Sequence, residues 1–287
     1  MNQSELVQLI KSKRSFLCVG LDSDIAKIPS SLMQLEDPVF EFNKRIIDAT
    51  LPYTIAYKPN LAFYEALGSK GMASLEKTMD YIQGLSDSVF TIADAKRGDI
   101  GNTAAMYAKA FFERMNFDAV TVSPYMGMDS LEPFLSYKDK WTIVLALTSN
   151  AGSGDFQKLH TSAEYPDNTT TESKKLYEAV MEKSIQAAGH QSQLMFVVGA
   201  THGEMIRNIR AVAPDNFLLV PGVGAQGGSL SSVAENGLNG HCGLLVNASR
   251  SIIFASSEED FEKAAAAEAS MMQKEMEQLL RDKEIID

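Results

Sequence analysis

Short apolar runs alternate with longer amphipathic stretches along most of the chain. Several of these runs are hydrophobic on both faces, which is typical of parallel strands covered by helices on each side. No Gly-x-Gly-x-x-Gly sequence follows the first run, which argues against an open dinucleotide-binding sheet. The alternation therefore predicts an α/β fold, a closed (β/α)8 TIM barrel. The eight predicted strands are residues 16–22, 53–58, 89–96, 119–123, 141–147, 194–200, 217–223 and 243–249.

Amphipathic segments supply the predicted helices. An N-terminal helix precedes the first strand, and residues 257–287 predict a final helix with a frayed tail. Residues 150–171 are long and polar for a connection after the fifth strand, so we expect a loop over the active-site end. The sequence shows no internal repeat and no linker, which predicts a single domain, residues 1–287. The clearest helical patterns between strands are residues 40–50, 72–85, 101–115 and 172–189.

Composition narrows the class of protein. The chain is 45% hydrophobic and 22% charged, with a net charge of −11. An acidic chain without clustered Lys and Arg is not expected to bind nucleic acid or an anionic membrane surface, although a local positive pocket can still bind a phosphorylated small molecule. No run approaches the ~18 apolar residues of a membrane span, and the N-terminus does not read as a signal peptide. We therefore expect a cytoplasmic protein.

Cysteine and histidine do not indicate a metal site. The two cysteines, Cys18 and Cys242, are too few for a disulfide framework and have no zinc-ligand spacing. The four histidines are scattered along the chain. We expect no metal and no cofactor, and we expect Cys18 to fill space inside the barrel.

Charged residues stand where the first three predicted strands end. Asp22 ends the first strand, Lys58 the second, and Asp94 and Lys96 the third, with Asp99 just beyond. Alternate residues of a strand share a face, so Asp94 and Lys96 should point together into the barrel mouth. Such an array of opposite charges keeps each group ionised. The alternative is a structural ion-pair network, but a position at a strand exit favours function.

Glycine-rich and basic residues follow the last two predicted strands. Residues 221–228 read Pro-Gly-Val-Gly-Ala-Gln-Gly-Gly, and residues 247–250 end in Arg250. Glycines let backbone N–H groups approach an anion, and Arg can bind phosphate through two hydrogen bonds. Each segment alone is weak, because glycine-rich turns often only permit a tight bend. Together, at the strands where barrels commonly bind phosphate, they predict a phosphate site.

Ser149 ends the fifth predicted strand within Thr148-Ser149-Asn150. These side chains can hydrogen-bond a polar ring or merely cap the next segment. No His–Asp relay accompanies Ser149, so a nucleophile is not expected.

These residues together resemble the orotidine 5′-phosphate decarboxylase family, in its longer-chain type 2 branch. The resemblance rests on five segments that span the first to the eighth predicted strand, and Asp-x-Lys-x-x-Asp is the specific one. The segments are residues 19–22, 56–60, 94–100, 221–228 and 247–250.

The resemblance implies a cofactor-independent decarboxylation of orotidine 5′-phosphate to uridine 5′-phosphate and CO2, the last step of pyrimidine nucleotide synthesis. It makes Lys96 the proton donor to the carbon that loses CO2, Asp94 the neighbour of the substrate carboxylate, and Lys58 the group that orders the array. It also implies a homodimer in which Asp99 reaches the neighbouring site. The implied substrate-binding residues are Asp22 and Thr103 at the ribose, Ser149 at the pyrimidine, and Pro221, Gly224, Gln226 and Arg250 at the phosphate.

Two other functions remain open from the residues. A magnesium-dependent sugar-phosphate lyase or decarboxylase of the same barrel superfamily shares Asp-x-Lys, but an additional acidic metal ligand at a strand end is not evident here. A non-catalytic nucleotide-binding barrel is the other reading, and the complete set of four charged residues argues against it.

Overall fold

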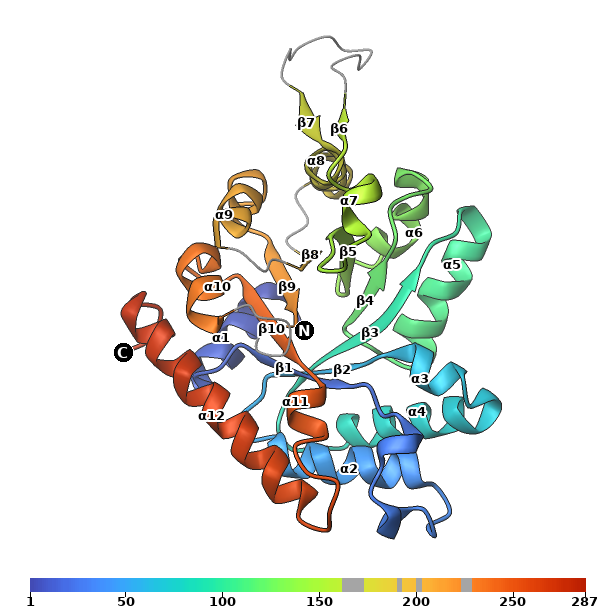
Figure 1. Ribbon diagram of the computed structural model, residues 1–287. Helices are drawn as coiled ribbons and strands as arrows, with labels where there is room; N and C mark the ends of the chain where they lie inside the picture. The colour runs from blue at the N-terminus through green and yellow to red at the C-terminus, as the bar shows by residue number, and fades with distance from the viewer. Residues whose placement is uncertain (162–172, 190–192, 200–202, 223–228) are drawn as a thin grey trace.

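The computed structural model describes residues 1–161, 173–189, 193–199, 203–222 and 229–287. Within these ranges eight parallel strands form one closed barrel, in the order β1-β10-β9-β8-β5-β4-β3-β2 (Figure 1). The predicted (β/α)8 fold is confirmed, and each predicted strand overlaps an observed one. The strands are β1 (Leu17–Leu21), β2 (Ala56–Pro59), β3 (Phe90–Arg97), β4 (Ala119–Val122), β5 (Trp141–Leu147), β8 (Leu194–Val198), β9 (Phe217–Pro221) and β10 (Leu244–Ala248).

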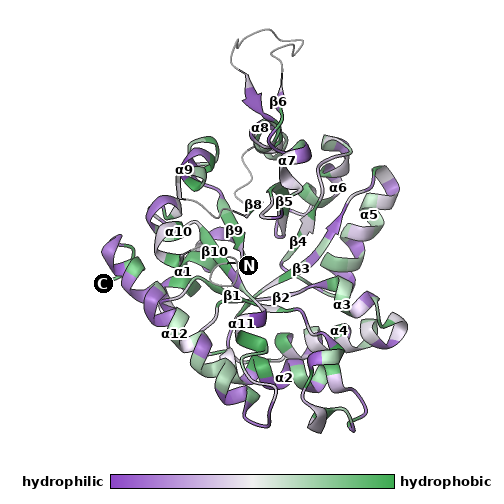
Figure 2. Cartoon of the chain, in the orientation of Figure 1, coloured by the Kyte–Doolittle hydropathy of each residue, from purple (hydrophilic) through white to green (hydrophobic). Residues whose placement is uncertain are grey.

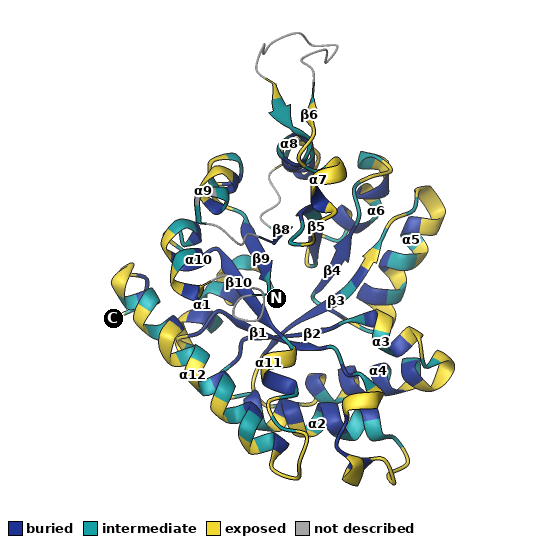
Figure 3. Ribbon diagram, in the orientation of Figure 1, coloured by how far each residue is buried: buried dark blue, intermediate teal, exposed yellow. Residues whose placement is uncertain are grey.

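The barrel strands are buried on both faces. Every residue of β1, β4, β8 and β10 is buried (Figure 3). Apolar residues fill these strands (Figure 2), as expected where one face meets the barrel interior and the other meets helices. This core fixes the strand register and therefore decides which side chains emerge at the carboxyl ends of the strands.

Helices surround the barrel, and the amphipathic segments of the sequence account for them. Most cover the strands from outside, while α11 follows the carboxyl end of β10 (Figure 1). Besides α1 and α7, which are described below, the helices are α2 (Pro38–Thr50), α3 (Leu61–Glu65), α4 (Gly68–Gln83), α5 (Gly101–Lys109), α6 (Glu132–Leu135), α8 (Leu176–Ala188), α9 (Gly203–Val212), α10 (Leu230–Gly237), α11 (Arg250–Ile253) and α12 (Phe261–Asp282).

The N-terminal helix α1 (Gln3–Lys13) lies across the amino-terminal end of the barrel. It begins with a capping box in which Asn2 and Glu5 each accept a hydrogen bond from the other's backbone N–H. Trp141, the first residue of β5, donates its indole N–H to the Met1 carbonyl at 2.8 Å. This end of the barrel is therefore covered, and the carboxyl ends of the strands are left for a site.

The segment after β5 contains more regular structure than a loop. Residues 150–161 include α7 (Ser153–Phe156), and β6 (His160–Thr161) pairs antiparallel with β7 (Lys174–Lys175). The predicted helix 172–189 begins only at Leu176, because its first described residues form β7. Residues 162–172 lie outside the described ranges.

The C-terminal tail is packed rather than frayed, so that part of the prediction was wrong. The final helix exists as α12, but Ile285 beyond it is buried and donates its backbone N–H to Leu280. Two apolar residues near the end of the chain, Ile285 and Ile286, contact the core. Burial of this apolar surface holds the tail in place.

No helix among the described residues is both long enough and apolar enough to cross a membrane.

Candidate active site

A cavity of about 160 Å³ opens at the carboxyl ends of the barrel strands. Parallel strands bring their carboxyl ends to one side of the barrel, so residues far apart in the sequence meet there. The lining combines acidic, basic and neutral polar groups. These are Asp22, Lys58, Asn60, Asp94, Pro221, Gly222, Asn247, Ala248, Ser249, Arg250 and Ser251.

Asp94 lies between two ammonium groups at this cavity. Its Oδ2 is 2.7 Å from Lys58 Nζ, and its Oδ1 is 2.5 Å from Lys96 Nζ. The Lys58 and Asp94 side chains are only 6% and 10% exposed, whereas the Lys96 side chain is 50% exposed. Lys96 is therefore the most accessible member of this group, and it reaches Asp94 from beside the cavity, whose lining includes Lys58 and Asp94 but not Lys96.

The charges of this group stabilise one another. Burial by itself raises the pKa of Asp94, but the charges and hydrogen bonds of Lys58 and Lys96 outweigh it and hold that pKa well below its ordinary value. Burial lowers the pKa of Lys58, yet Asp94 and Asp22 outweigh burial, so the net pKa is raised. Both partners are thus ionised at neutral pH.

Lys96 reaches Asp94 through an irregular backbone. Its φ of +47° is left-handed, and the β3–β4 register shifts between Ala93 and Arg97. The predicted contact of Asp94 with Lys96 is therefore present, but a bulge, not a regular alternation, produces it. The Lys96 backbone N–H donates to Thr121 Oγ1 at 2.9 Å, and that hydroxyl lies 3.1 Å from Asp94 Oδ1.

Asp99 does not join this group within the chain. Its carboxylate accepts the backbone N–H of Ile100 at 2.8 Å and forms no ion pair with Lys58 or Lys96. The structure thus brings together three of the four predicted charged residues. A role for Asp99 inside its own chain's cavity has no support in this geometry.

Asp22 presents an unsatisfied acceptor to the cavity. It follows β1 and lines the cavity, and its buried Oδ1 has no hydrogen-bond partner among the described residues. A buried acceptor without a partner is costly unless a ligand supplies a donor. Asp22 therefore fits a hydroxyl-bearing ligand.

The opposite wall depends on a close approach between β1 and the residues after β10. A Cβ on Gly20 would lie 1.9 Å from Ser249 Oγ and 3.1 Å from Asn247 Oδ1. Asn247 donates to Ser249 Oγ, and Cys18 Sγ lies 3.6 Å from Asn247 Oδ1. Burial raises the pKa of the Cys18 thiol to about 12, so this residue is a neutral part of the wall, in the interior position that was predicted.

The predicted phosphate region is only partly described. Pro221 ends β9, and Gly222 after it has a φ of +81°, which favours glycine. Arg250 is exposed at the start of α11 and lines the cavity. The predicted Gly224 and Gln226 lie outside the described residues.

Two predicted substrate residues lie outside the cavity lining. Ser149 is half-buried after β5, where a Cβ on Gly199 would lie 2.3 Å from the Ser149 backbone nitrogen. Thr103 is exposed in the first turn of α5. Neither residue lines the cavity as the described chain forms it.

Sequence reasoning missed three polar residues of this region. Asn60 lines the cavity and forms a bridge with Asp94 that continues the β2–β3 pairing, and Asn247 lines the opposite wall. Thr121 is buried beside Asp94. A signal for Thr121 existed, since it is the one polar residue in the apolar strand 119–122.

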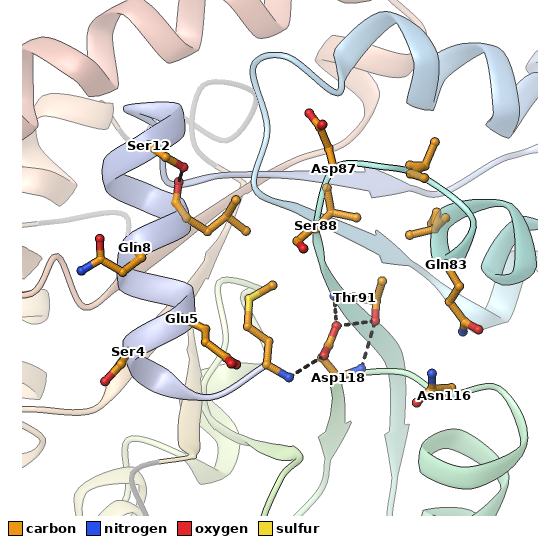
Figure 4. Close-up of a pocket in the computed structure, with 15 residues that line it drawn as sticks. Ser4, Glu5, Gln8, Ser12, Gln83, Asp87, Ser88, Thr91, Asn116 and Asp118 are labelled. Atoms are coloured by element: carbon orange, nitrogen blue, oxygen red, sulfur yellow. Dashed lines mark hydrogen bonds and ion pairs between the residues drawn. The ribbon is translucent and has the colours of Figure 1, made fainter.

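A larger hollow of about 910 Å³ lies at the other end of the barrel, between α1 and the segment that leads into β3 (Figure 4). Both oxygens of the Asp118 carboxylate in its lining already have partners. Oδ1 pairs with the Met1 amino group at 3.0 Å, and Oδ2 accepts hydrogen bonds from the N–H and the hydroxyl of Thr91. The described lining of this hollow contains no Lys or Arg, whereas the smaller cavity is lined by Lys58 and Arg250. The smaller cavity is therefore the candidate active site.

Among the described residues, no three His, Cys, Asp or Glu side chains lie close enough to hold a metal ion together.

Comparison with known proteins extends along nearly the whole chain. A sequence model of the Orotidine 5′-phosphate decarboxylase / HUMPS family matches residues 15–267. Orotidine 5′-phosphate decarboxylases from Parabacteroides distasonis and Porphyromonas gingivalis are each 56% identical to this chain, covering 100% of it and 99% and 100% of their own lengths. The structure titled Leishmania donovani OMP decarboxylase matches with a TM-score of 0.79 at 37% identity, covering 97% of this chain and 99% of that one.

Proposed function

This chain belongs to the orotidine 5′-phosphate decarboxylase / HUMPS family, and we propose that Lys96 supplies the proton in its reaction. The reaction is that of a carboxy-lyase: orotidine 5′-phosphate loses CO2 and becomes uridine 5′-phosphate, a step of pyrimidine nucleotide synthesis. The family resemblance predicted from the sequence is thereby confirmed. The observation that carries the proposal is the Lys58–Asp94–Lys96 group, in which Lys58 and Asp94 line the cavity and Lys96 pairs with Asp94.

The proposed chemistry begins with the bond between the pyrimidine ring and the carboxylate. That bond breaks, CO2 leaves, and the electron pair stays on the ring carbon. The Lys96 ammonium stabilises this developing negative charge and then transfers one proton to the carbon. A C–H bond forms, and Lys96 is left as a neutral amine that regains a proton from water.

Asp94 acts on the group that leaves. A substrate carboxylate held about 4 Å from Asp94 would cost roughly 4 kcal/mol at an effective dielectric of 20. This repulsion disappears as CO2 departs, so it favours the transition state over the bound substrate. Binding energy from the ribose and phosphate offsets the repulsion in the bound complex.

The remaining site residues bind parts of the substrate distant from the reacting carbon. The unpartnered Asp22 Oδ1 accepts a ribose hydroxyl, with Lys58 in the same cavity lining. The family resemblance assigns Thr103 to the ribose as well, although Thr103 lies outside this lining. Arg250 pairs with the phosphate, together with Pro221, Gly224 and Gln226 of the glycine-rich segment. Ser149 contacts the pyrimidine ring after β5.

We place a second copy of the chain beside Asp99. Four large apolar side chains near Asp99 are exposed. They lie on the segments around α5 and before α6, and these two helices contact each other. Burying them against a partner would bring Asp99 to the neighbouring site and form a homodimer. These side chains are Ile100, Met106, Tyr125 and Met126.

An absorbance assay on EDTA-treated protein tests the function. Orotidine 5′-phosphate should be consumed and uridine 5′-phosphate formed with no added metal. The same protein is assayed with ketose phosphates plus Mg²⁺. No orotidylate turnover, a strict metal requirement, or turnover of the sugar phosphates alone would contradict the proposal.

A further inference from the structure

Thr121 provides a single hydroxyl inside an apolar strand, in contact with both Asp94 and the backbone of Lys96. It lies on β4, is 0% exposed, and is flanked by Val120 and Val122. Its Oγ1 accepts the Lys96 backbone N–H at 2.9 Å. The same oxygen lies 3.1 Å from Asp94 Oδ1 and 3.5 Å from the Ala93 carbonyl.

One hydroxyl proton can form only one strong hydrogen bond. The Asp94 carboxylate is both nearer than the Ala93 carbonyl and charged, so the proton goes to Asp94. Thr121 therefore holds two parts of the site at once, the backbone of Lys96 as acceptor and the side chain of Asp94 as donor.

The backbone contact matters because Lys96 is left-handed, at a φ of +47°. Residues other than glycine rarely adopt this conformation, and surrounding contacts must maintain it. Within the described residues, Thr121 accepts the N–H of Lys96, and the Arg97 carbonyl accepts the N–H of Ser123 from the same strand pair. These two bonds fix the bulge that turns Lys96 toward Asp94.

We propose that Thr121 is a positioning residue of the decarboxylation, which keeps Asp94 and the Lys96 backbone in place while Lys96 gives up its proton. This inference rests on the proposed role of Lys96. In the resting site Asp94 Oδ1 is held by both Lys96 Nζ and Thr121 Oγ1. Once Lys96 has transferred its proton, its ion pair with Asp94 is lost and the neutral amine donates only a weaker hydrogen bond, so Thr121 becomes the principal donor to Oδ1.

This order of events predicts where the loss should be seen. The ground state has the Lys96–Asp94 ion pair to support the geometry, so nucleotide binding depends little on Thr121. Proton transfer weakens that support as the transition state is approached, so kcat depends strongly on the Thr121 hydroxyl. A merely structural residue would instead weaken folding, binding and turnover together.

The chain offers a matched control at the other end of the barrel. Thr91, on β3, forms the same two bonds: its hydroxyl donates to Asp118 Oδ2 and accepts the Asp118 backbone N–H, each at 2.9 Å (Figure 4). Thr91 is likewise buried. Thr91→Val thus removes an equivalent hydroxyl–carboxylate pair away from the candidate active site.

The experiment compares Thr121→Val, Thr121→Ser and Thr91→Val with the wild type. For each protein we measure kcat, the dissociation constant of uridine 5′-phosphate, and the urea midpoint. Thr121→Val should lower kcat roughly 10- to 100-fold, the loss expected for one hydrogen bond to a charged group. Its nucleotide affinity should change less than about threefold, a small fraction of that loss. Thr121→Ser, which keeps the hydroxyl, should restore most of kcat, and Thr91→Val should lower only the urea midpoint.

The proposal is overturned if Thr121→Val keeps the wild-type kcat, if Ser does not restore activity, or if Thr121→Val loses nucleotide affinity in proportion to kcat. If Thr121→Val does not fold, Thr121→Cys is measured in its place, since a thiol of similar size is a weak donor. Wild-type protein that does not turn over orotidylate would refute the proposed function itself. Wild-type turnover with unchanged Thr121 variants would refute only the role of Thr121.

Discussion

Asp94 is the residue on which the electrostatics of the site depend. One carboxylate separates two ammonium groups, and only Lys96 among them is substantially exposed. Together with Asp22 and Arg250 of the cavity lining, the Lys58–Asp94–Lys96 group carries a net charge of +1, which favours an anionic substrate. The Asp22 carboxylate, whose charge acts on Lys58, limits this excess and leaves a hydrogen-bond acceptor for the ligand.

The ionisation of Asp94 and Lys58 should be visible in the pH dependence of the free energy of unfolding. The depressed pKa of Asp94 contributes stability that is present above the unfolded value of about 3.9 and is lost as pH falls toward the folded pKa. The raised pKa of Lys58 contributes stability below about pH 10.4 that is lost as pH rises through the folded pKa. The contribution of the pair is therefore constant across neutral pH.

Asp94→Asn should lower the free energy of unfolding by roughly 3–5 kcal/mol near neutral pH, because Lys58 stays buried without its partner. Urea titrations should show that this difference narrows by about 1 kcal/mol between about pH 5 and pH 3, as the unfolded wild-type carboxyl takes up a proton. Arg114→Ala, which removes an ion pair with Glu76 whose two side chains are 73% and 43% exposed, is the control. An Asp94→Asn deficit that is the same at both pH values would contradict the assigned ionisation.

Sequence alternation predicted that Asp94 and Lys96 share a face, and their side chains do meet. It could not predict the route, because the bulge depends on a bond from Lys96 to Thr121, 25 positions away. For Asp99, too, the sequence predicted the position of the residue but not the direction of its side chain. Its position after the strand is visible in the sequence, but whether it turns to its own cavity depends on the backbone after β3.

At the scale of elements, β1 and the turn after β10 approach each other so closely that only glycine fits at position 20. Ser249 packs against Gly20 and accepts a hydrogen bond from Asn247. Arg250 follows Ser249 directly at the start of α11. Gly20 therefore sets the position of Arg250, the residue proposed to bind the phosphate.

Gly20→Ala should destabilise the protein by roughly 1–3 kcal/mol, the usual result of overpacking a buried site. It should also weaken binding of uridine 5′-phosphate, because a displaced Ser249 moves Arg250. In a Ser249→Gly background, which removes the atoms at 1.9 and 2.9 Å, both effects should shrink. Urea midpoints and binding isotherms on the four proteins measure this coupling, and equal effects in the two backgrounds would refute it.

The sequence predicted elements best where burial alone decides them. The barrel strands are apolar on two faces and were found within a few residues. Short-range polar patterns were less reliable: the start of α8 was predicted too early because pairing with β6 makes Lys174 and Lys175 extended. The tail was predicted to fray because Ile285 and Ile286 follow a charged helix, yet they reach the core.

In the whole molecule, the amino-terminal end of the barrel is covered by α1, and the candidate active site lies at the opposite end, where the strands have their carboxyl ends. Strand order brings residues from β1, β2, β3 and β10 to one cavity, which no local pattern in the sequence describes. Division of the chain into a single domain, residues 1–287, stays a prediction, and so does the dimer. The position of Asp99 beside exposed apolar side chains makes the dimer testable.

A subunit-mixing experiment tests whether Asp99 acts in a neighbouring site. Lys96→Ala and Asp99→Asn proteins should each be inactive alone. After unfolding and refolding together in equal amounts, half of the dimers are mixed and each has one intact site, so about one quarter of wild-type activity should return. Separate refolding followed by brief mixing is the control. No recovery from the mixed sample would place Asp99 in its own chain's site, and an Asp99→Asn protein that is active alone would place Asp99 outside catalysis.

Turnover of orotidine 5′-phosphate by Lys96→Ala, measured beside its affinity for uridine 5′-phosphate, tests directly whether Lys96 is the proton donor. Lys96 is half exposed and supports no other part of the described barrel with its side chain beyond Asp94, so the variant should fold and bind the product nucleotide. Turnover should be abolished, because no proton donor remains at the reacting carbon, while binding of uridine 5′-phosphate remains measurable. Substantial decarboxylation by Lys96→Ala would contradict it.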